Sequence, residues 1–162
     1  LELINQPVTF LPSQSDAKYT SIKANQQEAE MAALYAWQVW KDSKDCFDAH
    51  HTIGIITPYR NQIALIRKEL EKYGVKELMD ISVDTVERYQ GSERDVIIYS
   101  FCVNTLSQLK TLPNLTEENG VIIDRKLNVA LTRARKRLVI MGNPQLLRED
   151  PIYARLLDSI EK

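Results

Sequence analysis

The chain has 162 residues, a formal net charge of −1, and a composition that is 44% hydrophobic and 27% charged. These values are ordinary for one soluble globular domain, and they exclude a protein that coats nucleic acid through overall charge. The sequence shows no run of about 20 apolar residues and no secretory signal, so we expect no membrane span and an intracellular location.

The two cysteines and two histidines do not form a metal-binding pattern. Cys46 and Cys102 lack C-x-x-C spacing, and His50 and His51 add only adjacent ligands. We therefore expect no metal site. Cys102 ends an apolar run and is expected to be a reduced core residue, whereas Cys46 is expected to be more exposed.

The first expected elements are a short strand at 8–11 and a long helix. Asn25-Gln-Gln-Glu28 resembles a capping box with Asn in place of Ser or Thr, and predicts a helix from there to about Trp40. A polar connection at 41–51 follows.

The middle of the chain alternates apolar runs with one amphipathic segment. Thr57 is expected to cap a helix that has Pro58 at its first position and ends near Gly74. A terminal helix is expected from about Pro151. The expected buried strands are 53–56, 81–84, 96–101 and 138–141. Strands and helices that alternate without hairpin turns predict an α/β fold, a parallel sheet flanked by helices.

Residues 104–120 interrupt this rhythm and are expected to be an insertion loop. The segment is rich in Asn, Thr and Glu, and its leucines are too scattered to form one helix face. Such a stretch buries too little surface to offset the entropy of ordering it. We therefore predict a mobile surface loop.

Residues 125–137 form the most informative segment, because six of the thirteen are cationic. One stripe at helical spacing is apolar, and consists of Leu127, Ala130, Leu131 and Ala134. The opposite side carries Lys126, Val129, Arg133 and Lys136. Arg135 points nearly half a turn away from Arg133 and is expected to be structural and ion-paired. The segment fits either a solvated basic face or a helix that delivers one arginine to an anion.

Three segments in order resemble motifs of the second RecA-like domain of superfamily 1 helicases, in the branch of senataxin and the nonsense-mediated-decay helicase. The sequence V-D-T-V-E-R-Y-Q-G-S-E-R-D-V-I-I-Y-S at 83–100 resembles motif V. The sequence L-N-V-A-L-T-R-A-R at 127–135 resembles motif VI, and T-P-Y-R-N-Q at 57–62 precedes both. The resemblance implies a RecA-like fold for one domain over 1–162.

No G-x-x-x-x-G-K-[ST] sequence is present, so the chain lacks the phosphate-binding loop of these ATPases. The resemblance places that loop in a preceding RecA-like domain, with ATP and Mg²⁺ in the cleft between the two domains. The chain begins with Leu1 rather than Met, and we expect it to be part of a longer protein.

The resemblance implies roles for residues on the ATP side. Arg133 matches the arginine finger, which stabilises charge on the γ-phosphate, and Arg125 matches a basic position of the same motif. Gln90, Gly91 and Glu93 match nucleotide contacts, and Glu93 is suited to accept hydrogen bonds from ribose hydroxyls. An ordinary loop with a solvated glutamate is the alternative.

A second group is expected to contact nucleic acid. Thr57 and Thr85 stand where a strand ends, and hydroxyl and N–H groups there suit phosphate oxygens. Arg60 is a possible electrostatic partner. The expected function is the second motor domain of an ATP-dependent DNA or RNA helicase, inactive as an isolated chain. The alternatives are a non-catalytic nucleic-acid-binding module and a protein-interaction module.

Overall fold

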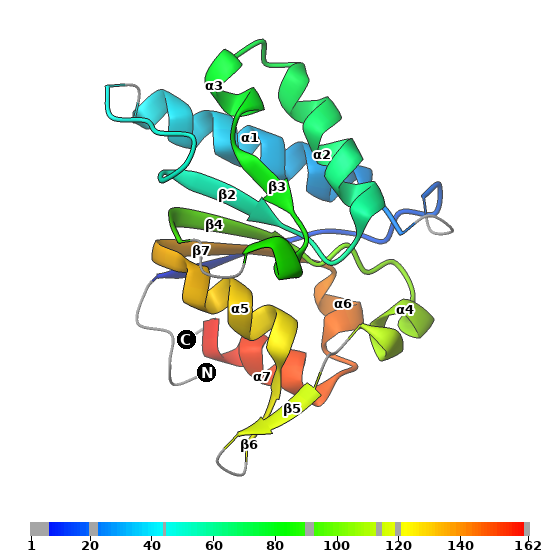
Figure 1. Ribbon diagram of the computed structural model, residues 1–162. Coiled ribbons are helices and arrows are strands. Elements are labelled where there is room, and N and C mark those ends of the chain that lie inside the picture. Colours follow the sequence, from blue (N-terminus) through cyan, green and yellow to red (C-terminus); the bar gives the residue numbers. More distant parts are fainter. Residues whose placement is uncertain are drawn as a thin grey trace.

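The computed structural model describes residues 7–19, 23–43, 45–89, 93–112, 115–118 and 121–160. A five-stranded sheet forms the centre, with strand order β1-β7-β4-β2-β3 and every neighbouring pair parallel (Figure 1). Its strands are β1 (Val8–Pro12), β2 (Ile53–Ile56), β3 (Ser82–Asp84), β4 (Arg94–Ser100) and β7 (Ala134–Gly142). The prediction of a parallel α/β fold is confirmed.

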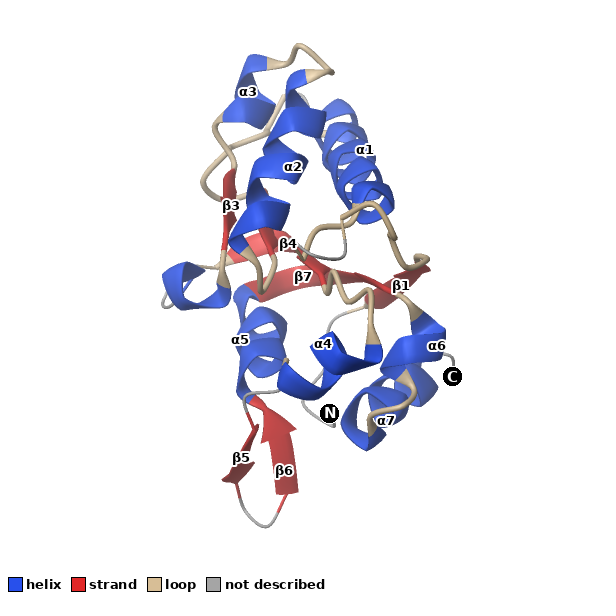
Figure 2. Ribbon diagram, turned by 90° about the vertical axis from the view of Figure 1, so that its right-hand side faces the viewer, coloured by secondary structure: helices blue, strands red, loops and turns tan. Residues whose placement is uncertain are grey.

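Helices cover both faces of this sheet (Figures 1 and 2). One face carries α1 (Gln26–Asp42), α2 (Arg60–Glu71) and α3 (Lys76–Met79). The other face carries η2 (Val86–Tyr89), α4 (Leu106–Thr111), α5 (Arg125–Arg133), α6 (Pro144–Leu147) and α7 (Pro151–Ile160). Within the described ranges, no helix is both long and apolar enough to cross a membrane.

Each face of the sheet packs its own apolar core, as expected for strands that are buried on both sides. The alanines of α1 pack with Ile66 and Leu70 of α2 on one face. On the other face, Phe101 makes edge-to-face contacts with Tyr99 and Tyr153, with ring centroids 4.8 and 5.0 Å apart. β2 follows the predicted bounds, and Cys102 is buried while Cys46 is exposed, as predicted.

The prediction of a loop over 104–120 is wrong for the residues that the structure describes. Thr105 caps α4 by accepting a hydrogen bond of 3.0 Å from Gln108 N. Leu109 and Leu112 are buried, whereas Leu106 is 42% exposed. The amide of Gln108 also donates to the carbonyl of Cys102 at 2.6 Å. Polar residues that are typical of loops thus satisfy buried backbone groups here.

Further along that segment lies β5 (Leu115–Glu118), which pairs antiparallel with β6 (Val121–Asp124) in a two-stranded ribbon. The ribbon lies apart from the main sheet and leads into α5 (Figures 1 and 2). The expectation of a loop over 104–120 missed this ribbon, although the sequence Asn119-Gly120 between the two strands is typical of hairpin turns.

Candidate nucleotide and nucleic-acid surfaces

Arg133 is the last residue of α5 and contacts the end of the preceding motif. Its Nε donates a hydrogen bond of 2.7 Å to the carbonyl oxygen of Tyr89, the last residue of η2. The side chain is half-buried, and no carboxylate in the described part of the chain pairs with its guanidinium. The backbone before Gln90 therefore orients the arginine, and no described acidic group neutralises its charge.

Tyr89 connects this arginine to the sheet. It is buried, and its hydroxyl donates to the carbonyl of Ser82 in β3. A side chain at Gly54 would collide with that hydroxyl, so the glycine lets the ring pack against β2. Burial raises the pKa of Tyr89, which keeps the hydroxyl neutral. The contact that holds Arg133 thus originates in the core.

The basic helix ends earlier than its pattern predicts. The sequence pattern places Ala134 on the apolar stripe of the helix and Lys136 on its cationic side. In the structure, β7 begins at Ala134. Ala134 pairs with Arg94, and Arg137 pairs with Val96 after a register shift. Backbone pairing with β4 therefore overrides the helical periodicity at these positions.

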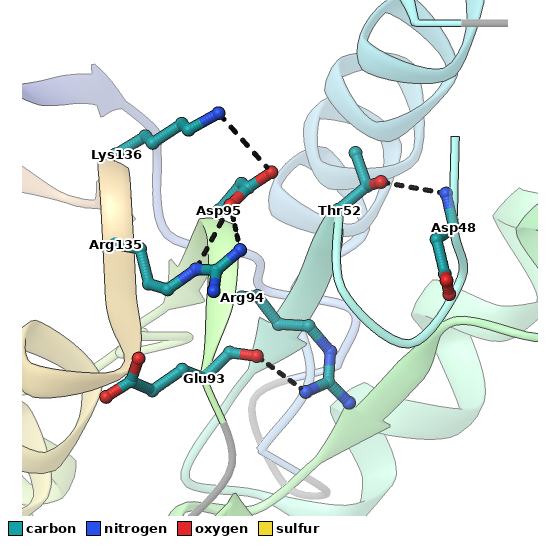
Figure 3. Close-up of polar contacts among 7 residues, drawn as sticks. All are labelled: Asp48, Thr52, Glu93, Arg94, Asp95, Arg135 and Lys136. Carbon is teal, nitrogen blue, oxygen red and sulfur yellow. Dashed lines mark hydrogen bonds and ion pairs between the residues drawn. The ribbon is translucent and has the colours of Figure 1, made fainter. Parts of the chain in front are cut away.

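Arg135 forms an ion pair, as predicted. Its guanidinium donates to one carboxylate oxygen of Asp95 at 2.7 and 3.1 Å, and Lys136 Nζ lies 3.8 Å from the other (Figure 3). The hydrogen bond with Asp95 raises the pKa of Arg135. This pairing distinguishes Arg135 from Arg133.

Glu93 is exposed one residue before β4, and its side chain and that of Arg94 point to different sides (Figure 3). Glu93 precedes Arg94 and Arg133 precedes Ala134, and Arg94 and Ala134 are register partners. The two expected nucleotide contacts therefore flank neighbouring strands at the amino edge of the sheet.

Arg94 is a residue that the sequence interpretation missed. Its guanidinium donates to the Glu93 carbonyl at 2.9 Å and to Ser82 Oγ at 3.2 Å, and lies 5.7 Å from the Tyr89 ring centroid. Arg94 thus ties the backbone beside Glu93 to Tyr89. Gln90 and Gly91 lie outside the described residues. Arg125 begins α5, and its side chain also lies outside the description.

Thr57 and Thr85 both lie at the opposite, carboxyl edge of the sheet. They follow Ile56 and Asp84, which are register partners, and Thr57 N donates to the Asp84 carbonyl at 3.2 Å. Thr57 has no exposed surface, and its hydroxyl has no partner among the described residues. Such a hydroxyl costs stability unless a ligand or a rearrangement satisfies it.

The interpretation of Thr57 as a helix cap is wrong. α2 begins at Arg60 with Tyr59 in the capping position and no side-chain cap. Thr57 continues the line of β2 because its N–H is used in pairing with β3. Arg60 is exposed in the first turn of α2, so it shares the carboxyl edge with both threonines.

A buried polar cluster lies near this edge, centred on Glu28. Its carboxylate accepts hydrogen bonds from Ser13 Oγ and Ser100 Oγ, both at 2.8 Å, and from Cys102 N at 3.0 Å. Burial raises its pKa to about 7, against the lowering effect of these hydrogen bonds.

The expected capping box is therefore only half formed. Asn25 Oδ1 accepts from Glu28 N at 2.9 Å, but Asn25 N donates to Gln62 Oε1 rather than to the glutamate. Glu28 turns into the core instead. No local pattern distinguishes a first-turn glutamate of this kind from a solvated one.

A family model described as an AAA domain matches residues 3–145. The chain therefore belongs to this AAA domain family. A solved C-terminal domain of a possible DNA helicase from Lactobacillus plantarum shares 15% identity at a TM-score of 0.47, covering 91% of this chain and 82% of that one.

Two relatives illustrate the sequence similarity. Helicase sen1 of Schizosaccharomyces pombe is 41% identical over 108 residues, 65% of this chain and 6% of that protein. Regulator of nonsense transcripts 1 of Dictyostelium discoideum is 42% identical over 109 residues, 65% of this chain and 8% of that protein. The resemblance to a helicase RecA-like domain of this branch is confirmed. The chain spans less than a tenth of the length of either relative.

Proposed function

We propose that this chain is the second motor domain of an ATP-dependent superfamily 1 helicase, and that Arg133 is its arginine finger. The observation that carries the proposal is the Arg133 Nε hydrogen bond to the Tyr89 carbonyl. It orients a half-buried cation that has no ion-pair partner in the described ranges. Membership of the AAA domain family and the helicase relatives support the same role.

The residues at the amino edge fit one side of a bound nucleotide. Arg133 would contact the γ-phosphate of ATP and stabilise negative charge in the transition state. Glu93 is exposed one residue before β4 and would accept hydrogen bonds from ribose hydroxyls. ATP supplies the phosphoanhydride bond that is broken, and Mg²⁺ would be held mainly by the first RecA-like domain. Gln90, Gly91 and Arg125 are proposed as further nucleotide contacts on the resemblance alone.

The carboxyl edge is proposed to contact single-stranded DNA or RNA through Thr57, Thr85 and Arg60. The adjacency of both threonines after paired strand residues supports this assignment. Because Thr57 is buried, a phosphate would reach its hydroxyl only after the surrounding residues move. The helicase relatives also support an intracellular location for the whole protein.

Replacing Arg133 in a polypeptide that carries both RecA-like domains tests the finger role. We expect Arg133→Ala to lower kcat for nucleic-acid-stimulated ATP hydrolysis by about 10³-fold or more, with KM for ATP changed little. Arg133→Lys should rescue little, because an ammonium lacks the planar donor geometry. Steady-state phosphate release measured against ATP concentration gives both constants.

Arg135→Ala is the matched control, since Arg135 lies two residues away and pairs with Asp95. It should retain near-wild-type kcat. A rise in KM alone for Arg133→Ala would identify Arg133 as a ground-state ligand and overturn the finger assignment.

A further inference from the structure

Lys23 lies at the carboxyl edge of the sheet, outside the three helicase motifs. Its side chain is exposed, and its backbone φ is 55°, in the left-handed region that residues other than Gly, Asn and Asp avoid. A lysine in this conformation needs support from its surroundings.

Buried contacts on consecutive residues provide that support. Cys102 Sγ donates to the Lys23 carbonyl at 3.3 Å, and Asn104 Nδ2 donates to the Ala24 carbonyl at 2.7 Å. The next residue, Asn25, donates its N–H to Gln62 Oε1 at 2.9 Å. The backbone around Lys23 is therefore anchored to the connection between β4 and α4 and to α2, while the Lys23 side chain is exposed.

The Lys23 ammonium lies over the ring of Tyr59. Its Nζ is 5.5 Å from the ring centroid of Tyr59, which is two residues after Thr57 and one before the exposed Arg60. A cation over an aromatic face is held by the ring quadrupole. Tyr59 thus holds a positive charge against the short stretch of chain that contains Arg60 and Thr57, whose buried hydroxyl has no partner in the described part.

We propose that Lys23 contacts a backbone phosphate of a single-stranded nucleic acid at this edge, with Tyr59 as its positioning residue. The proposal rests on the nucleic-acid half of the proposed function and extends that surface onto the segment before α1. A chain with a net charge of −1 must bind phosphates through local cations. A lysine acts there as a point charge, without reading the base sequence.

The test compares Lys23→Asn with Lys41→Gln in the 162-residue chain. Asparagine tolerates the left-handed backbone, so the first variant removes the charge without adding strain. Lys41 is the matched control, since its Nζ lies 5.1 Å from the Trp37 centroid at the opposite end of α1. Titration with ten-nucleotide oligothymidylate or oligouridylate at three salt concentrations, followed by NMR shifts of backbone amides, detects even weak binding.

We expect wild type and Lys41→Gln to bind alike. Lys23→Asn should bind both oligonucleotides more weakly, with the log–log salt slope reduced by about 0.7, the value for one phosphate on a single strand. Lys23→Arg should retain the slope. Equal losses with the DNA and RNA probes would identify the shared phosphate as the ligand, and a loss confined to one probe would contradict it.

The two possible failures are distinguishable. If wild type and Lys23→Asn bind with the same affinity and slope, the Lys23 contact is wrong and the proposed nucleic-acid surface stands. Weaker binding with an unchanged slope also overturns the phosphate contact. If wild type shows no shifts at low salt, the nucleic-acid half of the proposed function fails, and the Lys23 contact with it.

Discussion

At the scale of single residues, Glu28 shows how burial couples a side chain to pH. Its pKa is raised from 4.5 to about 7 because the carboxylate has no exposed surface. Between these values the folded chain binds more protons than the unfolded chain. The free energy of unfolding therefore falls as pH rises through about 7. The full contribution of Glu28 to stability is present only below about pH 4.5.

Glu28→Gln should remove this dependence, because an amide keeps hydrogen-bonding capacity without titrating. Relative to the variant, wild type should lose about 3 kcal/mol between pH 4.5 and 8, from about 1.4 kcal/mol per pKa unit. Urea unfolding across this pH range, followed by circular dichroism, measures the difference. Glu30→Gln, at an exposed position on the same helix, is the control and should run parallel to wild type. If the free energy of unfolding of Glu28→Gln also changed with pH in parallel with wild type, the pKa of Glu28 would not be raised in the folded chain.

At the scale of elements, α4 shows why the composition of residues 104–120 led to the wrong expectation of a loop. A helix of six residues needs little apolar surface when capping and side-chain amides satisfy its buried groups. Leu109 and Leu112 complete the core beneath it, while Leu106 remains exposed. The leucine spacing was present in the sequence, but the polar residues around it also suit a loop.

Leu109→Ala should lower the free energy of unfolding by about 2–5 kcal/mol, because it leaves a cavity in the core. Leu106→Ala removes the same atoms from a side chain that is 42% exposed, and should change stability by about 0.5 kcal/mol or less. Urea denaturation of wild type and both variants measures these changes in the free energy of unfolding. Equal small effects would mean that α4 does not pack against the core as described.

At the scale of the whole molecule, the sheet separates two sets of residues. Glu93 and Arg133 precede paired residues of β4 and β7 at the amino edge. Thr57 and Thr85 follow paired residues of β2 and β3 at the carboxyl edge. A parallel sheet thus gives one domain two chemically different surfaces, which suits a motor that links a nucleotide to a nucleic acid.

The isolated chain should not hydrolyse ATP above background, because its sequence contains no phosphate-binding loop. Phosphate release from highly purified chain, with and without oligonucleotide, measures this. Adding the first RecA-like domain in the same polypeptide should produce activity that depends on Arg133. Turnover by the isolated chain that Arg133→Ala abolishes would contradict a site shared between two domains.

The parallel α/β fold and the order of the motifs follow from the amino-acid sequence alone. Both depend on local patterns: apolar runs such as 53–56, helical spacing, and motif residues at set intervals. The family resemblance also selected Arg133 over Arg135, and the Arg135 ion pair agrees with that choice.

The way in which distant segments combine could be seen only in the folded chain. The end of α5 at Arg133 depends on strand pairing with β4, which competes with a helical pattern that continues to Lys136. The burial of Glu28 depends on Ser100 and Cys102, more than 70 residues away in sequence. Lys23 faces Tyr59 only because contacts across the fold hold its backbone. Local propensity cannot encode such contacts, because their energy arises from groups that folding brings together.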